Sequence, residues 1–494
     1  MRSITYPASW VRAATVRERC SQKETNLPAI ALILAALLSS ACTVGPNYKR
    51  PTVPAPAAFR APQPLPPDQA ASLADLKWFQ VFKDPQLQDL VRAALARNYD
   101  LRDATARVEA ARASLGITRS EQVPTVAAGG NIEFNRLSRA GATPLPAAFL
   151  PNQNRTFGNA VLELLSYEID IWGRLRRATE VARANLLSAE ETRKAVVTTL
   201  VSDVATSYLT LRELDYELEI SRRTLRTREE SLDLVRQREA GGVSTQLDRR
   251  QAEQLVYTAA ETIPVTQERI EQRENQISLL LGDNPRGVSR GRAFTDQDLP
   301  PDVPPGLPSA LLERRPDIRA AEQDLIATNA DIGVARAAYY PQISLSGFLG
   351  GASTQLSSLF SGAHSTWSLV PQASQPIFTA GRIKSGVRLA EAERDHALVQ
   401  YERVIQTAFT EVSDALIAHQ RMRESREKQE ALVNALEDRL RLAYMRYRGG
   451  VDTQLNALDA DRDLFTAQLA LAQLRLEEIL SVVQLYKALG GGWQ

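Results

Sequence analysis

The sequence repeats itself, and this duplication constrains the fold more than any other feature. Gly116 and Pro124 correspond to Gly333 and Pro341 at a constant offset of 217 residues. Further along, WGRLR at Trp172 corresponds to a later AGRIK, and the offset there has fallen by nine, to 208. Because insertions accumulate in exposed loops, nine extra residues between Pro124 and Trp172 indicate a surface loop in the first copy. We expect one architecture built from two equivalent halves.

Residues 1–41 have the layout of a secretory signal peptide. Basic residues precede the apolar run LPAIALILAALL, and small residues then lead to Cys42. The run is too short to remain in a membrane as a spanning helix. Because SSAC is similar to a bacterial lipobox, we expect cleavage before Cys42 and covalent attachment of a palmitate-containing lipid to its thiol, with no other cofactor. The alternative is an uncleaved apolar segment beside an incidental cysteine.

Charge and residue counts exclude several classes of function. The chain has 59 Lys and Arg against 58 Asp and Glu, which gives no electrostatic reason to expect a nucleic acid partner. The histidines His364, His396 and His419 are far apart, and no cysteine follows Cys42, so the sequence shows no metal-site spacing. The motif GRIKSG at Gly381 lacks the Lys and Ser or Thr of a phosphate-binding loop. We therefore expect that the protein is not an enzyme.

Four segments are expected after the signal peptide. Residues 42–76 are rich in proline, which predicts an extended, lipid-anchored strap. The two halves follow at 77–283 and 307–494. A linker rich in Pro, Gly and Asp joins them at 284–306.

Each half is expected to contain one helix, then one β-hairpin. Pro124 and Pro341 end the helical periodicity of the two halves. Apolar and polar residues then alternate, as in ISLSG, which predicts hairpins at about 124–171 and 341–379. The same alternation also occurs in half-buried sheets of soluble proteins.

Two stretches without Gly or Pro predict unusually long helices. They are 174–240 and 387–448, and at about 1.5 Å per residue each can extend for roughly 90–100 Å. A glycine pair and a shorter helix follow each one, at 243–281, which Pro264 is expected to interrupt, and at 451–489. Apolar residues at spacings of three and four predict a packed stripe on both long helices. These residues are Val197, Leu200, Val201, Val204, Tyr208, Leu211, Leu214 and Leu218, then Ile405, Ala408, Phe409, Val412 and Leu416.

Hairpins and long helices together predict an oligomeric conduit. Strands in lipid cannot leave an edge unpaired, so they must close into a barrel of at least about eight strands. Four strands per chain are too few. Two, three or four copies would supply eight, twelve or sixteen strands. The attached helices would continue this barrel as a helical cylinder.

Six motifs give the chain a specific resemblance to a known family. They are CTVGPNY at Cys42, RRPDI at Arg314, AAYYPQISLSG at Ala337, AGRI at Ala380, YRGGVDTQLNALDA at Tyr447 and LYKALGGGW at Leu485. In this order they resemble the TolC-like outer-membrane factors, and among these the OprM/NodT-type lipoproteins of tripartite efflux pumps. The resemblance extends from Cys42 to the C-terminus.

The resemblance implies a mainly α fold with membrane β-barrel segments. The expected assembly is a homotrimer with a twelve-stranded barrel in the Gram-negative outer membrane, continued by a long periplasmic α-barrel with an equatorial domain. It would be a passive exit channel for drugs or other small molecules. Its partners would be a periplasmic adaptor (membrane fusion protein) and an inner-membrane transporter of the RND type. Two alternatives are the outlet duct of a type I protein secretion system and a periplasmic coiled-coil scaffold lipoprotein, which would not need the hairpins.

In that family, adaptor hairpins dock at a periplasmic tip formed by the turns between paired helices. Here those turns are AGGVSTQLD and GGVDTQLN. Glycine is also expected at such turns for conformational reasons alone. The residues concerned are Gly241, Gly242, Val243, Thr245, Gly449, Gly450, Val451 and Thr453.

The resemblance places a periplasmic gate on Leu455 and Asp459. These residues are four apart and therefore on one helix face. A ring of carboxylates at a narrow mouth would favour cations. The first half has Leu247 and Gln251 at the equivalent positions, so a charged gate would come from the second half alone. The alternative role of Leu455 is ordinary packing between helices.

Overall fold

The computed structural model describes residues 43–54, 56, 58–61, 72–136, 154–297, 306 and 308–493. The expected signal peptide and Cys42 lie outside these residues. The strap ends in the 3₁₀ helix η1 (Leu73–Asp75), and the linker contains the 3₁₀ helix η3 (Phe294–Asp296). The first half contains α2 (Trp78–Val81), α3 (Pro85–Arg97), α4 (Tyr99–Ser120), β1 (Val126–Arg136), β2 (Asn154–Glu168), α5 (Arg174–Ala240) and α6 (Gln246–Leu280). The second half contains α7 (Pro308–Arg314), α8 (Pro316–Ala337), β3 (Gln342–Ser353), η4 (Leu356–Ser358), η5 (Gly362–His364), β4 (Ser365–Ser374), α9 (Arg382–Arg448) and α10 (Gln454–Ala488).

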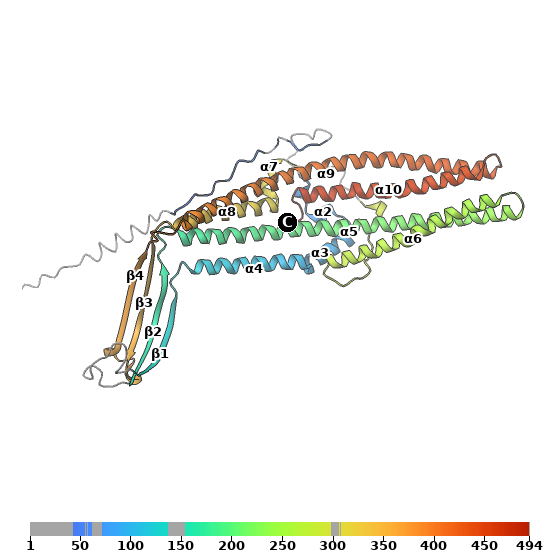
Figure 1. The fold of residues 1–494 in the computed structure, drawn as a ribbon. Helices are drawn as coiled ribbons and strands as arrows, with labels where there is room; N and C mark the ends of the chain where they lie inside the picture. Colours follow the sequence, from blue (N-terminus) through green and yellow to red (C-terminus); the bar gives the residue numbers. More distant parts are fainter. Residues whose placement is uncertain are drawn as a thin grey trace, which may run out of the picture. The chain divides into compact units, whose positions relative to one another are not determined.

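Both halves have the same order of elements, which confirms the predicted duplicated, mainly α fold (Figure 1). In each, short helices precede a β-hairpin, a helix of 67 residues and a helix of 35 residues. The first hairpin is the longer one, as the insertion predicts, because β2 has 15 residues and β4 has 10. The segment between β1 and β2, at 137–153, lies outside the described residues.

Two details of the long helices differ from the prediction. α9 begins at Arg382 and includes Gly386, since one glycine costs a helix only about 1 kcal/mol. The interruption expected at Pro264 is wrong, because α6 continues through this residue. Pro264 is exposed, so the carbonyl that loses its partner can be hydrated, while Ala259 and Thr266 on either side are buried.

The short helices before each hairpin are broken where a single helix was expected. In the first half the break is at Asn98, whose side chain accepts a hydrogen bond from the Leu101 N–H at 3.0 Å. Its amide also donates to the carbonyl of Leu280 at 3.0 Å, which ties the break to the end of α6. In the second half the break is at Arg315, because the residue before Pro316 avoids the helical conformation.

The strands form one antiparallel sheet in the order β1-β2-β3-β4. Because β2 pairs with β3, the sheet spans both halves. The register shifts by a bulge between Leu164 and Tyr167, near the end of the sheet that leads into the helices. The strands predicted from the period-two alternation are confirmed.

The helices continue the order of the strands as a single curved layer, called the helical wall below (Figure 1). Nearer the sheet, α4 packs on α5, α5 on α8, and α8 on α9. Farther from it, α6 packs on α5, α5 on α10, and α10 on α9. Helices of the first half therefore occupy one side of the wall and helices of the second half the other.

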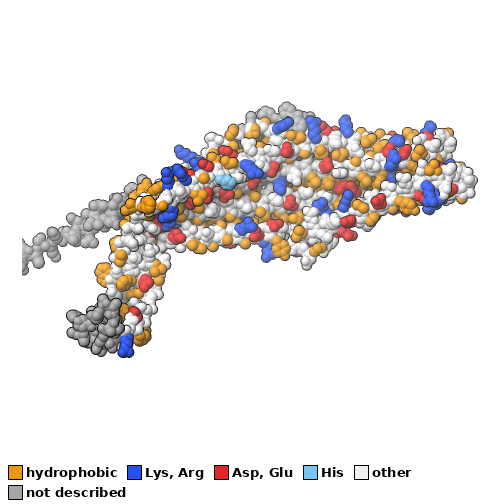
Figure 2. Space-filling model, in the orientation of Figure 1, with side chains coloured by type: hydrophobic (Ala, Val, Ile, Leu, Met, Phe, Trp, Pro, Cys, Tyr) orange, Lys and Arg blue, Asp and Glu red, His pale blue; other side chains and the backbone are white. Residues whose placement is uncertain are grey.

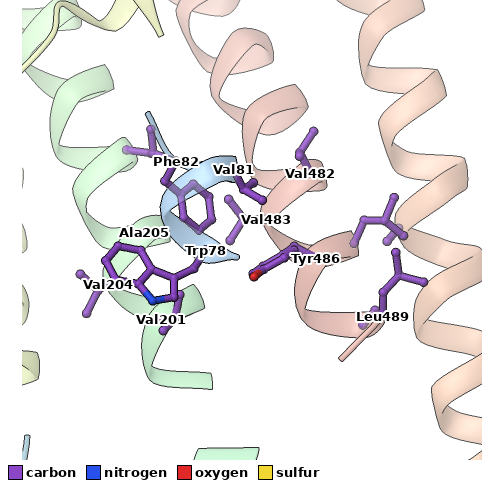
Figure 3. Close-up of a cluster of buried hydrophobic side chains, with 14 of the residues drawn as sticks. Trp78, Val81, Phe82, Val201, Val204, Ala205, Val482, Val483, Tyr486 and Leu489 are labelled. Atoms are coloured by element: carbon purple, nitrogen blue, oxygen red, sulfur yellow. The ribbon is translucent and has the colours of Figure 1, made fainter. Parts of the chain in front are cut away.

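The main hydrophobic core lies on one side of this wall, where α2 and α3 cover α5 and α10 (Figure 3). The ring of Phe82 meets that of Tyr486 edge-on at 6.1 Å, and the Tyr486 hydroxyl donates to the carbonyl of Leu76 at 2.9 Å. The Tyr208 hydroxyl donates to Asp84 at 2.9 Å. Burying one large apolar side chain stabilises a fold by about 1.5–3 kcal/mol. The predicted stripe is confirmed, since it is buried at Leu200, Val201, Val204, Tyr208, Leu211, Leu214, Ile405, Ala408, Phe409, Val412 and Leu416.

Candidate functional site

The two faces of the sheet differ, because one is largely apolar and the other mixes polar and apolar side chains. Strand pairing aligns Ala128, Leu162, Leu349 and Trp367 in one row across all four strands. Trp367 is 74% exposed and Leu349 is 61% exposed. Figure 2 shows charged side chains spread over the helices and fewer on the visible part of the sheet. An exposed apolar face of this kind fits a lipid environment. The opposite face is mixed, since it carries apolar as well as polar side chains. They are Asn131, Glu133, Phe157, Asn159, Val161, Glu163, Ser346, Phe348, Thr366, Ser368 and Val370.

Both layers end in open edges. Within the described part of the chain, β1 and β4 each pair on one side only. In the helical wall, α4 and α6 lie at one edge and α9 at the other. A sheet edge in lipid is unstable until another strand pairs with it, so one chain is an incomplete structure. Exposed apolar side chains on the edge helices are Ile117 of α4, Tyr257, Val265 and Leu279 of α6, and Val399, Leu432, Leu442 and Met445 of α9.

Both helical hairpins turn through the same backbone motif. Gly242 has a φ of 72°, and its N–H donates to the carbonyl of Glu239 at 2.9 Å. The next N–H, of Val243, donates to the carbonyl of Arg238 at 2.8 Å. Equivalent bonds form around Gly450, whose φ is 71°. This Schellman motif requires a left-handed residue, so glycine is explained at the second position of each pair.

The first glycine of each pair has a different explanation. Gly241 and Gly449 have φ of −80° and −74°, which any residue adopts. Both glycines are exposed, and so are Val243 at 69% and Val451 at 67%. The turn alone therefore does not require Gly241, where a Cβ would meet no atom closer than 3.6 Å, whereas at Gly449 a Cβ would lie only 3.3 Å from the carbonyl oxygen of Met445.

The two turns are capped differently. Thr245 and Asp248 form a capping box, in which the threonine hydroxyl accepts from the Asp248 N–H at 3.1 Å and the carboxylate accepts from the Thr245 N–H at 2.8 Å. Thr453 makes no such side-chain bond. Asp452 replaces it by accepting from the Thr453 N–H at 2.8 Å and from the Arg446 guanidinium at 2.9 Å. The hydrogen bond from Arg446 is the largest cause that lowers the pKa of Asp452.

Leu455 and Asp459 lie together on the solvent-accessible face of α10, opposite the buried Ala457. Leu455 is 48% exposed and is not packed between helices of its own chain. Asp459 forms an exposed ion pair with Arg462 at 3.2 Å. The equivalent residue of the first half, Leu247, is 66% exposed. The structure thus brings the two expected gate residues to one accessible face.

A buried ion pair lies behind this face, and no sequence pattern predicts it. Arg228 of α5 and Asp461 of α10 are both buried and paired. Arg228 also donates to the carbonyl of Leu255 in α6 at 2.8 Å. Hydrophobic periodicity does not identify such a pair, because it says nothing about which charged residue on another helix a buried charge meets.

Cys42 lies outside the described residues, but the chain that follows it is firmly packed. The N–H of Val44 donates to the carbonyl of Trp172 at 3.0 Å, where β2 leads into α5. Gly45 lies against the backbone of α8, and a Cβ there would be 2.5 Å from the Cα of Gly333. The start of the strap, at Val44 and Gly45, is therefore held at the junction between the sheet and the helices.

Other kinds of site are absent from the described residues. They contain no group of three or more His, Cys, Asp and Glu side chains placed to hold a metal ion. None of the described helices has an apolar stretch long enough to cross a membrane.

An incomplete sheet with one largely apolar face, continued in the same order by long helices, is typical of a membrane channel protein. The chain matches the family model of outer membrane efflux proteins over residues 90–283 and 307–491. It is 38% identical over 471 residues to the probable efflux pump outer membrane protein TtgC of Pseudomonas putida, and the aligned region covers 94% of this chain and 95% of that protein. It is 37% identical over 469 residues to outer membrane protein OprJ of Pseudomonas aeruginosa, with coverage of 94% and 96%.

A solved structure shows the same fold. The open-state MtrE outer membrane channel of Neisseria gonorrhoeae superposes with a TM-score of 0.83 at 32% identity, covering 92% of this chain and 99% of that one. The protein belongs to the outer membrane efflux protein family, and its fold is TolC-like. The resemblance found in the sequence is confirmed.

Proposed function

We propose that this protein is the passive exit channel of a tripartite efflux pump in the Gram-negative outer membrane. One observation carries the proposal: the strands and the helices follow the same order, and both layers end in open edges. Copies joined at these edges would form a barrel in lipid and a continuous tube beyond it. The cargo is drugs or other small molecules, and the drive comes from an inner-membrane transporter of the RND type through a periplasmic adaptor.

The assembly we propose is a homotrimer. Two copies would give eight strands, a number at which side chains nearly fill a barrel, whereas three give twelve and leave a lumen. At each joint, β4 and α9 of one copy would meet β1, α4 and α6 of the next. The exposed apolar side chains on these edge helices would be buried there, as at Leu279 and Leu432. Family resemblance favours three copies over four.

The periplasmic tip is the proposed adaptor-docking surface. It consists of the two turns that carry the glycine pairs, and each turn exposes a valine at the free end of a helical hairpin. Next to it, Leu455 and Asp459 would form two stacked rings in a trimer, an apolar one and an acidic one. Their exposure on one face of α10 supports this role.

We also propose that lipid on Cys42 anchors the strap to the outer membrane. The support is the fixed position of Val44 and Gly45 at the sheet–helix junction, beside the part of the molecule that would enter lipid. Cys42→Ser should abolish labelling of the protein by radioactive palmitate in growing cells. Labelling that persists in this variant would exclude the lipobox.

The alternatives account for less of the structure. A scaffold lipoprotein needs no sheet with an exposed apolar face, and Trp367 at 74% exposure has no role there. An outlet for secreted proteins would share the fold and differ in cargo. The proposed function includes no catalytic step and no nucleic acid partner.

Two measurements test the proposal. Purified protein added to a planar lipid bilayer should produce discrete ion conductance steps. A strain without the gene should accumulate a fluorescent small-molecule drug, and plasmid-borne protein should restore its export. Protein that inserts without conducting, or a deletion that leaves drug accumulation unchanged while blocking secretion of a protein, would contradict the small-molecule exit channel.

A further inference from the structure

A groove of about 640 Å³ lies between α9 and α10, and its floor borders the main core, because Ala415 belongs to that core and Leu480 packs against it. On α10, Leu480 and Gln484 line the groove, whereas Val482 and Tyr486 point into the core. Residues two apart on a helix point in nearly opposite directions, so Gln484 faces away from the core that Val482 and Tyr486 enter. The apolar floor of the groove consists of Ala415, Ala418, Met422 and Leu480.

The rim of the groove is acidic. Its carboxylates are Glu411, Asp414 and Glu477. Glu411 accepts a hydrogen bond from Arg315 at 2.6 Å, so its charge is compensated. Asp414 and Glu477 form no ion pair within the described residues, and Glu477 accepts only a bond of 3.4 Å from an uncharged glutamine.

The one cation of the groove does not neutralise these two carboxylates. Lys487 lies at one end of the groove, and its charge acts on Asp203 of α5, where it opposes the effect of burial on the pKa of that carboxyl. The groove therefore combines an apolar floor with two carboxylates that form no ion pair within the described part of the chain.

We propose that this groove binds an organic cation with an apolar body and serves as a resting site for cargo on the channel wall. This rests on the proposed function and on an assembly in which α2 and α3 lie outside the tube, because the groove would then open toward the lumen. Asp414 and Glu477 attract the positive charge, and the floor accepts the apolar body. Met422 has an unbranched, polarisable side chain that adapts to ligands of different shape. The volume is in the range of about 300–1,000 Å³ that is usual for small-molecule sites.

Two isosteric ions of opposite charge test the proposal. Wild-type protein in lipid nanodiscs should bind tetraphenylphosphonium, with empty nanodiscs as the blank for partition into lipid, and should bind tetraphenylborate far more weakly. D414N/E477Q should weaken tetraphenylphosphonium binding by about tenfold or more, because both attracting charges are removed. D89N/E427Q is the matched control, because it removes the same two charges from other exposed positions, at Asp89 of α3 and Glu427 of α9.

A second variant tests the floor without changing charge. Ala418→Phe fills the groove and should also weaken tetraphenylphosphonium binding. Equal binding of this cation by wild type, D414N/E477Q and A418F would overturn the proposal, and so would equal binding of the two ions by wild type. Ion conductance in a planar bilayer distinguishes failure of the binding-site proposal from failure of the proposed channel function. A protein that conducts but does not bind tetraphenylphosphonium contradicts the binding site alone. A protein that does not conduct contradicts the channel function.

Discussion

Arg228 of α5 and Asp461 of α10 form an ion pair whose side chains are only 3% and 8% exposed, with Nε and Oδ2 2.5 Å apart. The guanidinium also lies over the ring of Phe465 at 4.9 Å and donates to the carbonyl of Leu255 in α6. One arginine therefore connects the helical hairpin of the first half to that of the second, close to the expected gate.

Arg228→Met should loosen this connection strongly. It leaves a buried carboxylate without a partner, which typically costs about 3–5 kcal/mol. Burial raises the pKa of Asp461 and Arg228 opposes that shift, so the variant should become less stable as pH rises and the carboxyl must ionise. Hydrogen exchange of α10 measures the effect. Arg441→Met is the control, since its ion pair with Asp438 is exposed and worth less than about 1 kcal/mol. Equal exchange in both variants would show that the buried pair has no special role.

Glu213 should make stability depend on pH. Burial, with a contribution from the carboxyl of Glu217, raises the pKa of Glu213 from 4.5 to about 9. Between these values the native protein holds a proton that the unfolded chain has lost, so stability falls as pH rises through this window. Glu213→Gln stays neutral and should be more stable than wild type at pH 8, by a margin that grows by up to about 1.4 kcal/mol per pH unit.

Thermal unfolding at pH 5, 7 and 8 measures this difference. Glu219→Gln, at an exposed position of α5, is the control. A wild-type pH profile identical to that of Glu213→Gln would contradict a protonated Glu213.

Gly242→Ala should destabilise the first tip turn, whereas Gly241→Ala should not. Alanine in the left-handed conformation costs roughly 1–2 kcal/mol, and Gly242 has a φ of 72°. Gly241 has a φ of −80°, and a Cβ there would meet no atom closer than 3.6 Å. Hydrogen exchange of the Val243 amide reports on the turn. If the Val243 amide exchanges at the same rate in Gly241→Ala and Gly242→Ala, the turn does not depend on the left-handed glycine.

Asp459→Ala should increase the conductance of the purified protein in a planar bilayer. The reason is the loss of the exposed carboxylate that pairs with Arg462 beside Leu455, where we propose the gate. Gln251→Ala changes the equivalent position of the first half and should leave conductance unchanged. Identical conductance of wild type and Asp459→Ala would remove Asp459 from the gate.

The sequence predicts the long-range architecture well because the signals are long. A run of 67 residues without Gly or Pro predicts a helix and no other regular structure, and α5 has the predicted bounds. Because the two halves repeat each other, the helices and strands of the second half could be predicted from those of the first. The errors are local. Pro264 and Gly386 were read as helix breakers, but an exposed proline and a single glycine cost less than the packing of the surrounding helix provides.

At the candidate site, the sequence predicts where the turns lie along the chain better than it predicts which side chains contact one another. The two tip turns follow from glycine pairs between helices, but which glycine is left-handed depends on where each helix ends. Thr453 repeats the place of Thr245 without its capping bond, because Asp452 takes that role. The partners of Arg228 come from two other helices, Leu255 from α6 and both Asp461 and Phe465 from α10. Contacts of that kind depend on tertiary packing, which neither spacing nor composition encodes locally.

The mass of the purified, detergent-solubilised protein tests the central claim most directly, because one chain supplies four strands with two unpaired edges. Light scattering with the detergent contribution subtracted should give three times the mass of the chain. A particle with the mass of one chain that keeps its helical content and its bilayer conductance would contradict closure between copies.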